Sequence, residues 1–111
     1  MNTSNIKLGY WKIRGIAQPI RYMLEYLKVS YSEATYIDID SWGREKFNLG
    51  LDFPNLPFLT DQEKKLTESW AIIQYIATKF SRKDLIGITE DDKIKISMVY
   101  GVVTDIRSAL F

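Results

Sequence analysis

Cysteine and histidine are both absent from this chain of 111 residues. Without cysteine, the chain can form no disulfide or thiolate metal site and has no thiol nucleophile of its own. Without histidine, it has no imidazole base and no His-ligated zinc site, so we expect no bound metal. Its chemistry must therefore come from tyrosine, serine, lysine, arginine and carboxylate groups, or from a bound ligand.

An excess of one charge and a long apolar run are also missing. The 15 Lys and Arg residues face 14 Asp and Glu residues, for a formal net charge of +1. This balance gives no strong field to attract nucleic acid, so we expect no nucleic-acid partner. No stretch approaches the roughly 18 apolar residues of a membrane span. The polar residues 1–5 do not resemble the apolar part of a signal peptide. We therefore expect a cytoplasmic protein without a membrane span.

Residues 6–80 carry alternating strand and helix patterns. We expect a strand over 6–11, helix 17–27, strand 31–39, helix 41–49, strands 58–60 and 65–67, and helix 69–80. Ser41 is a candidate N-cap for the short helix. A strand–helix–strand start predicts parallel strands, and two short neighbouring strands predict an antiparallel hairpin. The order indicates an α/β fold of the thioredoxin-like type, βαβαββα, with helices on both faces of a mixed four-stranded sheet.

A further helix is expected after a linker. Thr89 is followed by three acidic residues, which suit the N-terminus of a helix. Two apolar stripes then run along it, formed by Ile96, Val99, Val103, Ile106 and Leu110, and by Ile94, Met98 and Val102. A helix that is apolar on two faces needs two neighbours. Either the chain is part of a longer protein, or another chain covers this surface.

Three runs, residues 8–15, 45–57 and 69–77, resemble glutathione transferases, with the mu class closest. The resemblance extends over essentially the whole chain. It implies that residues 1–83 are the thioredoxin-like glutathione-binding domain. Residues 84–111 would be the linker and the first helix of a truncated C-terminal helical domain, which is all-α in this family.

The resemblance also implies an enzyme that conjugates glutathione to hydrophobic electrophiles, as in detoxification, with glutathione as cosubstrate and no further cofactor. Tyr10 resembles the catalytic residue, a phenol that donates a hydrogen bond to the glutathione sulfur. Such a bond favours the thiolate over the thiol. From the residues alone, Tyr10 could instead be a strand aromatic that packs on a helix.

The positions that resemble the family's glutathione-binding residues are Trp11, Trp42, Lys46, Asn55, Leu56, Pro57, Glu68, Ser69 and Asp105. A cis bond before Pro57 would turn the backbone of Leu56 toward the cysteinyl unit. Lys46 would pair with the glycyl carboxylate. Ser69 would hold the γ-glutamyl carboxylate, although it also suits an ordinary N-cap. Asp105 would reach the γ-glutamyl amine across a dimer, or it is simply a solvated charge.

Other positions bear on the electrophile and on partners. Ile13 and Ile16 could line the electrophile pocket, although core packing explains them equally well. Phe53 resembles the aromatic residue that inserts into a neighbouring subunit. However, the positions of the family's interface charges hold Gln74, Ser97 and Tyr100. We expect a homodimer, or association with another chain through the last helix.

Two other functions have to be weighed. A non-catalytic transferase-like module, acting as a structural or assembly subunit, would fit the altered interface and the two-faced last helix. A thiol–disulfide oxidoreductase on the same fold is excluded, because that chemistry needs a protein thiol.

Overall fold

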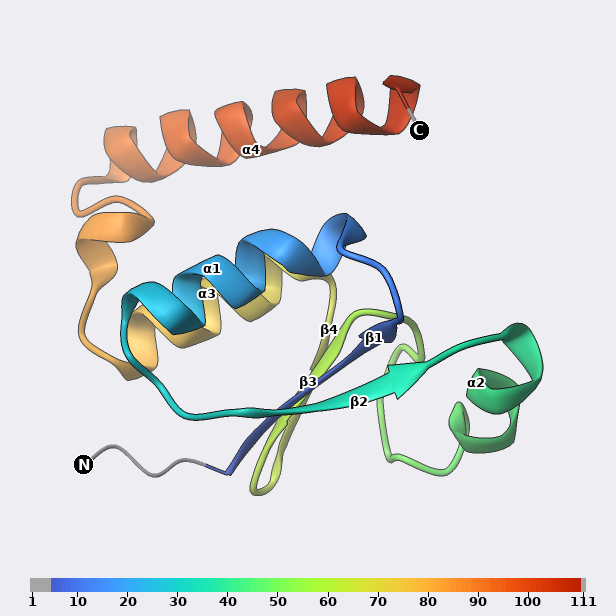
Figure 1. Ribbon diagram of the computed structural model, residues 1–111. Coiled ribbons are helices and arrows are strands. Elements are labelled where there is room, and N and C mark those ends of the chain that lie inside the picture. Colours follow the sequence, from blue (N-terminus) through green and yellow to red (C-terminus); the bar gives the residue numbers. More distant parts are fainter. Residues whose placement is uncertain (1–4, 111) are drawn as a thin grey trace. The chain divides into compact units, whose positions relative to one another are not determined.

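The computed structural model describes residues 5–110 (Figure 1). The elements are β1 (Ile6–Trp11), a 3-10 turn η1 (Gly15–Ala17), α1 (Gln18–Tyr26), β2 (Ser32–Tyr36), α2 (Ile39–Glu45), β3 (Phe58–Asp61), β4 (Lys64–Thr67), α3 (Ser69–Lys79), η2 (Lys83–Leu85) and α4 (Glu90–Leu110). They follow the predicted order. The chain forms two compact units that divide between residues 73 and 74. Within residues 5–110, no helix combines the length and the apolar character that crossing a membrane would require.

The four strands form one mixed sheet in the order β2-β1-β3-β4. β1 and β2 are parallel and β3 and β4 are antiparallel, as predicted, and β3 also runs antiparallel to β1. Trp11 lies opposite Tyr36, Gly9 opposite Phe58, and Phe58 opposite Thr67. Consequently β1, β2 and β4 end, and β3 begins, at the same edge of the sheet. We call this edge the exit edge.

The two faces of the sheet carry different helices. Side chains alternate along a strand, so Leu8 and Tyr10 point to one face and Gly9 to the other. On the first face, the guanidinium of Arg21 in α1 lies 6.0 Å from the centre of the Tyr10 ring. On the second face, the Phe58 ring covers Gly9 and stacks on Trp42 of α2 at 5.9 Å. The helices α1 and α2 therefore pack on opposite faces.

Among residues 5–110, the largest fully buried side chains are aliphatic except for Phe58. They are Phe58, Ile6, Leu8, Ile20, Leu24, Leu59, Ile72 and Ile76. In α1, Ile20 and Leu24 are one helical turn apart and both buried, whereas Tyr22 and Tyr26 on the other side are exposed. This spacing is what seats an amphipathic helix on a sheet.

The helix α2 begins two residues earlier than the sequence predicts. Asp38 is in the extended conformation, and its side chain accepts a hydrogen bond of 2.7 Å from the backbone N–H of Ser41. Ser41 in turn accepts from the N–H of Asp38, which completes a capping box. The prediction of Ser41 as N-cap is therefore wrong, because Asp38 holds that position. Hydrogen bonds from the Ser41 backbone and side chain hold the pKa of the Asp38 carboxyl below its ordinary value.

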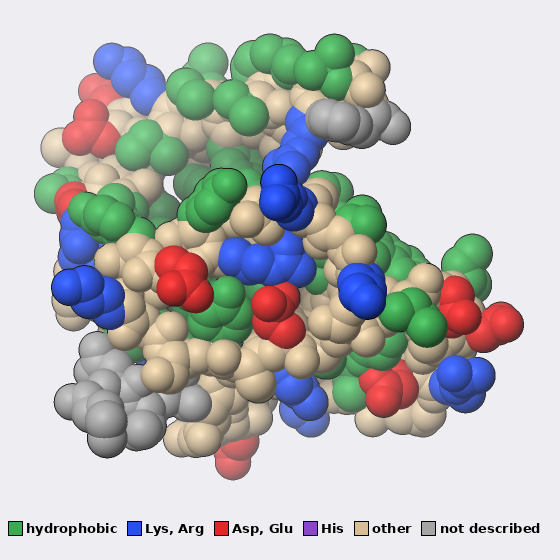
Figure 2. All heavy atoms as spheres, viewed as in Figure 1, with side chains coloured by type: hydrophobic (Ala, Val, Ile, Leu, Met, Phe, Trp, Pro, Cys, Tyr) green, Lys and Arg blue, Asp and Glu red, His purple; other side chains and the backbone are tan. Residues whose placement is uncertain are grey.

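The second unit ends in α4. The Thr89 side chain accepts a hydrogen bond of 3.1 Å from Asp92 N–H, so the predicted cap is confirmed. Gly87 precedes it at φ +105°, and a Cβ there would lie only 2.6 Å from the backbone nitrogen of Lys93. No described residue of α4 is buried. Hydrophobic side chains cover much of its surface in the view of Figure 2, where acidic and basic side chains are also interspersed.

Gly9 is predicted to be essential for packing. A Cβ at this position would overlap the Phe58 ring, whereas one at Gly43 in α2 would meet nothing within 4 Å. We expect Gly9→Ala to lower the free energy of unfolding by about 1–3 kcal/mol, since the ring must move. The control Gly43→Ala should be neutral or stabilising by up to about 1 kcal/mol, because alanine favours helix. Urea unfolding measures both, and an equal effect of the two substitutions would contradict the packing argument.

Candidate functional site

The exit edge brings together most of the residues that the sequence predicts as a site. Tyr10 and Trp11 end β1, Asn55, Leu56 and Pro57 lead into β3, and Glu68 and Ser69 follow β4. The strand β2 leads into α2, which carries Trp42 and Lys46 and lies beyond the same edge (Figure 1). The strand register therefore gathers segments that are far apart in the sequence.

The Tyr10 hydroxyl is held by the backbone of the loop after β1. Its oxygen accepts a hydrogen bond of 3.0 Å from Ile16 N–H, and the side chain is only 6% exposed. Gly15 adopts φ +44°, and a Cβ at Gly15 would collide with this hydroxyl. A hydroxyl that accepts one hydrogen bond still has its own hydrogen to donate. The local backbone thus orients a phenol as a donor.

Arg21 organises that loop, a role that the sequence pattern does not indicate. Its Nη1 donates to the carbonyl oxygens of Ile13 (3.3 Å) and Arg14 (3.2 Å). Its Nε donates to Oε1 of Glu33 at 2.7 Å, which ties α1 to β2. An arginine within a predicted helix gives no signal of such a role, because its partners come from elsewhere in the fold.

The segment before β3 has the predicted cis peptide bond between Leu56 and Pro57. Both residues are buried, whereas Asn55 is exposed. The side chain of Asn55 accepts a hydrogen bond of 2.9 Å from Leu56 N–H. A ligand that pairs with this amide must therefore displace the Asn55 oxygen.

Glu68 and Ser69 form the junction between β4 and α3. Glu68 has φ +73°, a conformation that costs a non-glycine residue free energy. Its carbonyl accepts a hydrogen bond of 3.0 Å from Ile72 N–H, and α3 begins at Ser69. Glu68 therefore stands directly before the helix, and the two interpretations of Ser69 stay predictions. Backbone outliers of this kind cluster at functional sites.

The two predicted residues of α2 differ in their surroundings. Trp42 is 6% exposed and packs against Tyr36 and Phe58, with ring centres 5.1 and 5.9 Å away. Lys46 is half-buried at the C-terminus of the helix, and its Nζ lies 5.5 Å from the centre of the Phe47 ring. Trp42 thus anchors α2 against the sheet, and Lys46 provides a positive charge at the C-terminal end of the helix.

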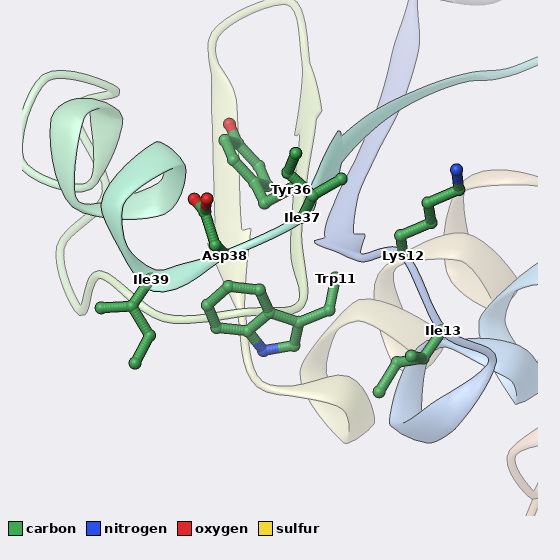
Figure 3. Close-up of a pocket in the computed structure, with 7 residues that line it drawn as sticks. All are labelled: Trp11, Lys12, Ile13, Tyr36, Ile37, Asp38 and Ile39. Atoms are coloured by element: carbon green, nitrogen blue, oxygen red, sulfur yellow. The ribbon is translucent and has the colours of Figure 1, made fainter.

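A hollow of about 500 Å³ opens beside Trp11, between the end of β1 and the turn into α2 (Figure 3). It is lined by Trp11, Lys12, Ile13, Tyr36, Ile37, Asp38 and Ile39. Ile13 is 60% exposed and Ile16 is 41% exposed, so the core-packing alternative for these two residues is wrong. The sequence analysis did not identify Ile37 and Ile39, because it assigned them to the strand.

Two predicted residues remain, Phe53 and Asp105. Phe53 is 76% exposed in the loop before β3. Asp105 is exposed on α4, in the second unit. Their roles stay predictions. Among residues 5–110, no group of three or more acidic side chains is arranged to hold a metal ion.

Comparison with known protein families shows to which family a chain with this arrangement belongs. The family model described as glutathione S-transferase, N-terminal domain, matches residues 6–78. This chain belongs to that family. The predicted resemblance and the thioredoxin-like fold class are therefore confirmed.

Relatives of the glutathione S-transferase family share this sequence closely. A class-mu 26 kDa isozyme from Schistosoma mansoni is 50% identical over 103 residues, which cover 91% of this chain and 51% of the relative. Glutathione S-transferase B from Cavia porcellus is 47% identical over 110 residues, covering 93% and 49%. The crystal structure of the transferase Blo t 8 superposes with a TM-score of 0.83 at 41% identity, covering 94% and 48%. The chain spans about half the length of the curated relatives it matches.

Removing Arg21 should loosen the loop that holds Tyr10. We expect Arg21→Met to lower the free energy of unfolding by about 0.5–1.5 kcal/mol, because two hydrogen bonds to exposed carbonyl groups and the ion pair with Glu33 are lost to solvent. Amide exchange of Ile16 should accelerate more than exchange in β1. Urea unfolding and hydrogen exchange measure these effects. The control Arg44→Met, at an exposed position in α2, should change neither quantity; a matching loss in the control would contradict the role of Arg21.

Proposed function

We propose that this chain is the glutathione-binding part of a glutathione transferase, and that Tyr10 stabilises the glutathione thiolate. The observation that carries the proposal is the Tyr10 hydroxyl, which Ile16 N–H fixes at the exit edge. A free thiol has a pKa of about 8.5, so only a small fraction is thiolate at neutral pH. A phenol that donates to the sulfur favours the anion, and each pKa unit is worth about 1.4 kcal/mol.

The reaction needs no nucleophile from the protein. The glutathione sulfur loses its proton to solvent and attacks an electrophilic carbon, forming a carbon–sulfur bond while the electron pair of the broken bond leaves with the electrophile's leaving group. The absence of cysteine and histidine from this chain is compatible with that route. We propose that no cofactor takes part.

Glutathione would lie along the exit edge. The backbone of Leu56 would pair with the cysteinyl unit in the manner of an added strand, once Asn55 releases its amide. Ser69 and the first backbone amides of α3 would hold the γ-glutamyl carboxylate, and Glu68 would accept from the γ-glutamyl amine. Lys46 would pair with the glycyl carboxylate. The proposed set also includes Trp11, Trp42 and Asp105.

The electrophile would be apolar. The hollow beside Trp11 supports this proposal, because Ile13, Ile37 and Ile39 expose aliphatic surface into or beside it. Such a surface favours a hydrophobic molecule over a charged one.

The hydroxyl of Tyr10 is tested by Tyr10→Phe. We expect the unsubstituted chain to bind glutathione with millimolar or tighter affinity and to lower the thiol pKa. In the variant that pKa should rise by roughly one to two units, since a hydrogen bond to a charged group is worth about 1.5–3 kcal/mol. Calorimetry gives the affinity, and ultraviolet absorbance of the thiolate against pH gives the pKa.

The matched control is Tyr22→Phe, which removes an exposed hydroxyl on α1. It should leave both affinity and thiol pKa unchanged. Absence of glutathione binding by the unsubstituted chain would refute the proposed function, and an unchanged thiol pKa in Tyr10→Phe would refute the role of Tyr10.

A non-catalytic structural or assembly subunit is the second candidate function. The exposed apolar side chains of α4, together with Phe53, favour this candidate because they offer surface to a partner or a second copy. The native mass in solution and transferase turnover separate the two functions. A stable complex without turnover would favour the assembly role, and turnover would favour the enzyme, whether or not it is a dimer.

A further inference from the structure

Tyr36 contacts α2 at two points. Its ring meets Trp42 edge-on, with ring centres 5.1 Å apart and planes at 68°. Its hydroxyl donates a hydrogen bond to Oε2 of Glu45, in the last turn of the helix. Tyr36 ends β2 and is only 5% exposed, so it is a fixed point of the sheet.

Besides these two contacts, the stack of Trp42 on Phe58 holds α2 against the sheet. It contains seven residues, and Trp42 is its single buried residue. A helix this short is marginal without tertiary contacts. The hydrogen bond from Tyr36 to Glu45 therefore restrains the C-terminal end of α2. The Trp42 contact alone would leave that end less constrained.

The restrained end carries the cation of the proposed site. Lys46 directly follows Glu45, and its N–H donates to the carbonyl of Trp42 at 2.8 Å. The position of the last helical turn thus fixes where the Lys46 side chain starts. Burial, and then the bond to Glu45, raise the pKa of the Tyr36 hydroxyl above its ordinary value of 10.0, so the phenol remains a donor at neutral pH.

We propose that Tyr36 and Glu45 are positioning residues for the glycyl end of glutathione: their hydrogen bond sets the last turn of α2 and thereby aims Lys46 at the glycyl carboxylate. This inference rests on the proposed function. It assigns a binding role to two residues that need not touch the ligand, and it restricts that role to one carboxylate.

The test compares glutathione with its glycyl ethyl ester, in which that carboxylate is neutral. Calorimetry gives the dissociation constants of both ligands for the full chain and for Tyr36→Phe, Glu45→Ala and Glu45→Gln. Tyr36→Phe keeps the ring against Trp42 and removes only the donor. We expect Tyr36→Phe and Glu45→Ala to weaken glutathione about tenfold, the scale of one charge-assisted hydrogen bond. The affinity of these two variants for the ester should fall by less than about twofold, because the glycyl end of the ester carries no charge for Lys46 to pair with.

Two further comparisons separate positioning from general stability. Glu45→Gln keeps an oxygen that accepts from the phenol, so it should retain most of the glutathione affinity. Combined with Lys46→Met, Tyr36→Phe should cause no additional loss, because residues that act through one another are not additive. Tyr22→Phe is the matched control for loss of a tyrosine hydroxyl and should change the affinity for neither ligand.

The outcomes are distinct. The inference is supported if Tyr36→Phe and Glu45→Ala lose affinity for glutathione but not for the ester, and if Tyr36→Phe causes no further loss when Lys46→Met is already present. An equal loss of affinity for both ligands, or no loss of affinity for either ligand, overturns the inference while the proposed function stands. If the unsubstituted chain binds neither ligand, the proposed function fails and the inference is overturned with it.

Discussion

The pairing of Gly9 with Phe58 is the contact on which the rest of the first unit depends. It sets the register of β1 against β3, and this register places Tyr10 beside the segment that contains Leu56 and Pro57. It also leaves space for the Phe58 ring, on which Trp42 stacks. One missing side chain therefore determines both the geometry of the exit edge and the attachment of α2.

The candidate site relies on backbone groups as well as on side chains. Ile16 N–H orients the phenol of Tyr10, and the Leu56 amide donates to the Asn55 side chain directly before the cis bond to Pro57. Backbone groups are positioned by the fold itself, so they lose little entropy when a ligand binds. The proposed function therefore requires neither cysteine nor histidine from the chain.

Much of this arrangement was predictable from the sequence, for identifiable reasons. Alternation in β1, the spacing of Ile20 and Leu24, and the prolines before β3 each act locally, so the order of elements and the hairpin were predicted correctly. The Ser41 cap was wrong because Asp38, three residues earlier, is extended and accepts from the Ser41 N–H, which places Ser41 inside the helix. The role of Arg21 and the bond between Tyr36 and Glu45 were not identified, because the tertiary fold sets these contacts. The bonds of Arg21 to Ile13, Arg14 and Glu33 span 7 to 12 positions, and the bond of Tyr36 spans 9.

The bond between Asn55 and the Leu56 amide has an energetic consequence for an empty site. A buried amide without an acceptor would cost free energy, and the Asn55 oxygen removes that cost before any ligand arrives. When a peptide takes over the amide, one acceptor replaces another, and the count of satisfied donors on the protein does not change. The net gain at this position is therefore only the difference between two similar hydrogen bonds.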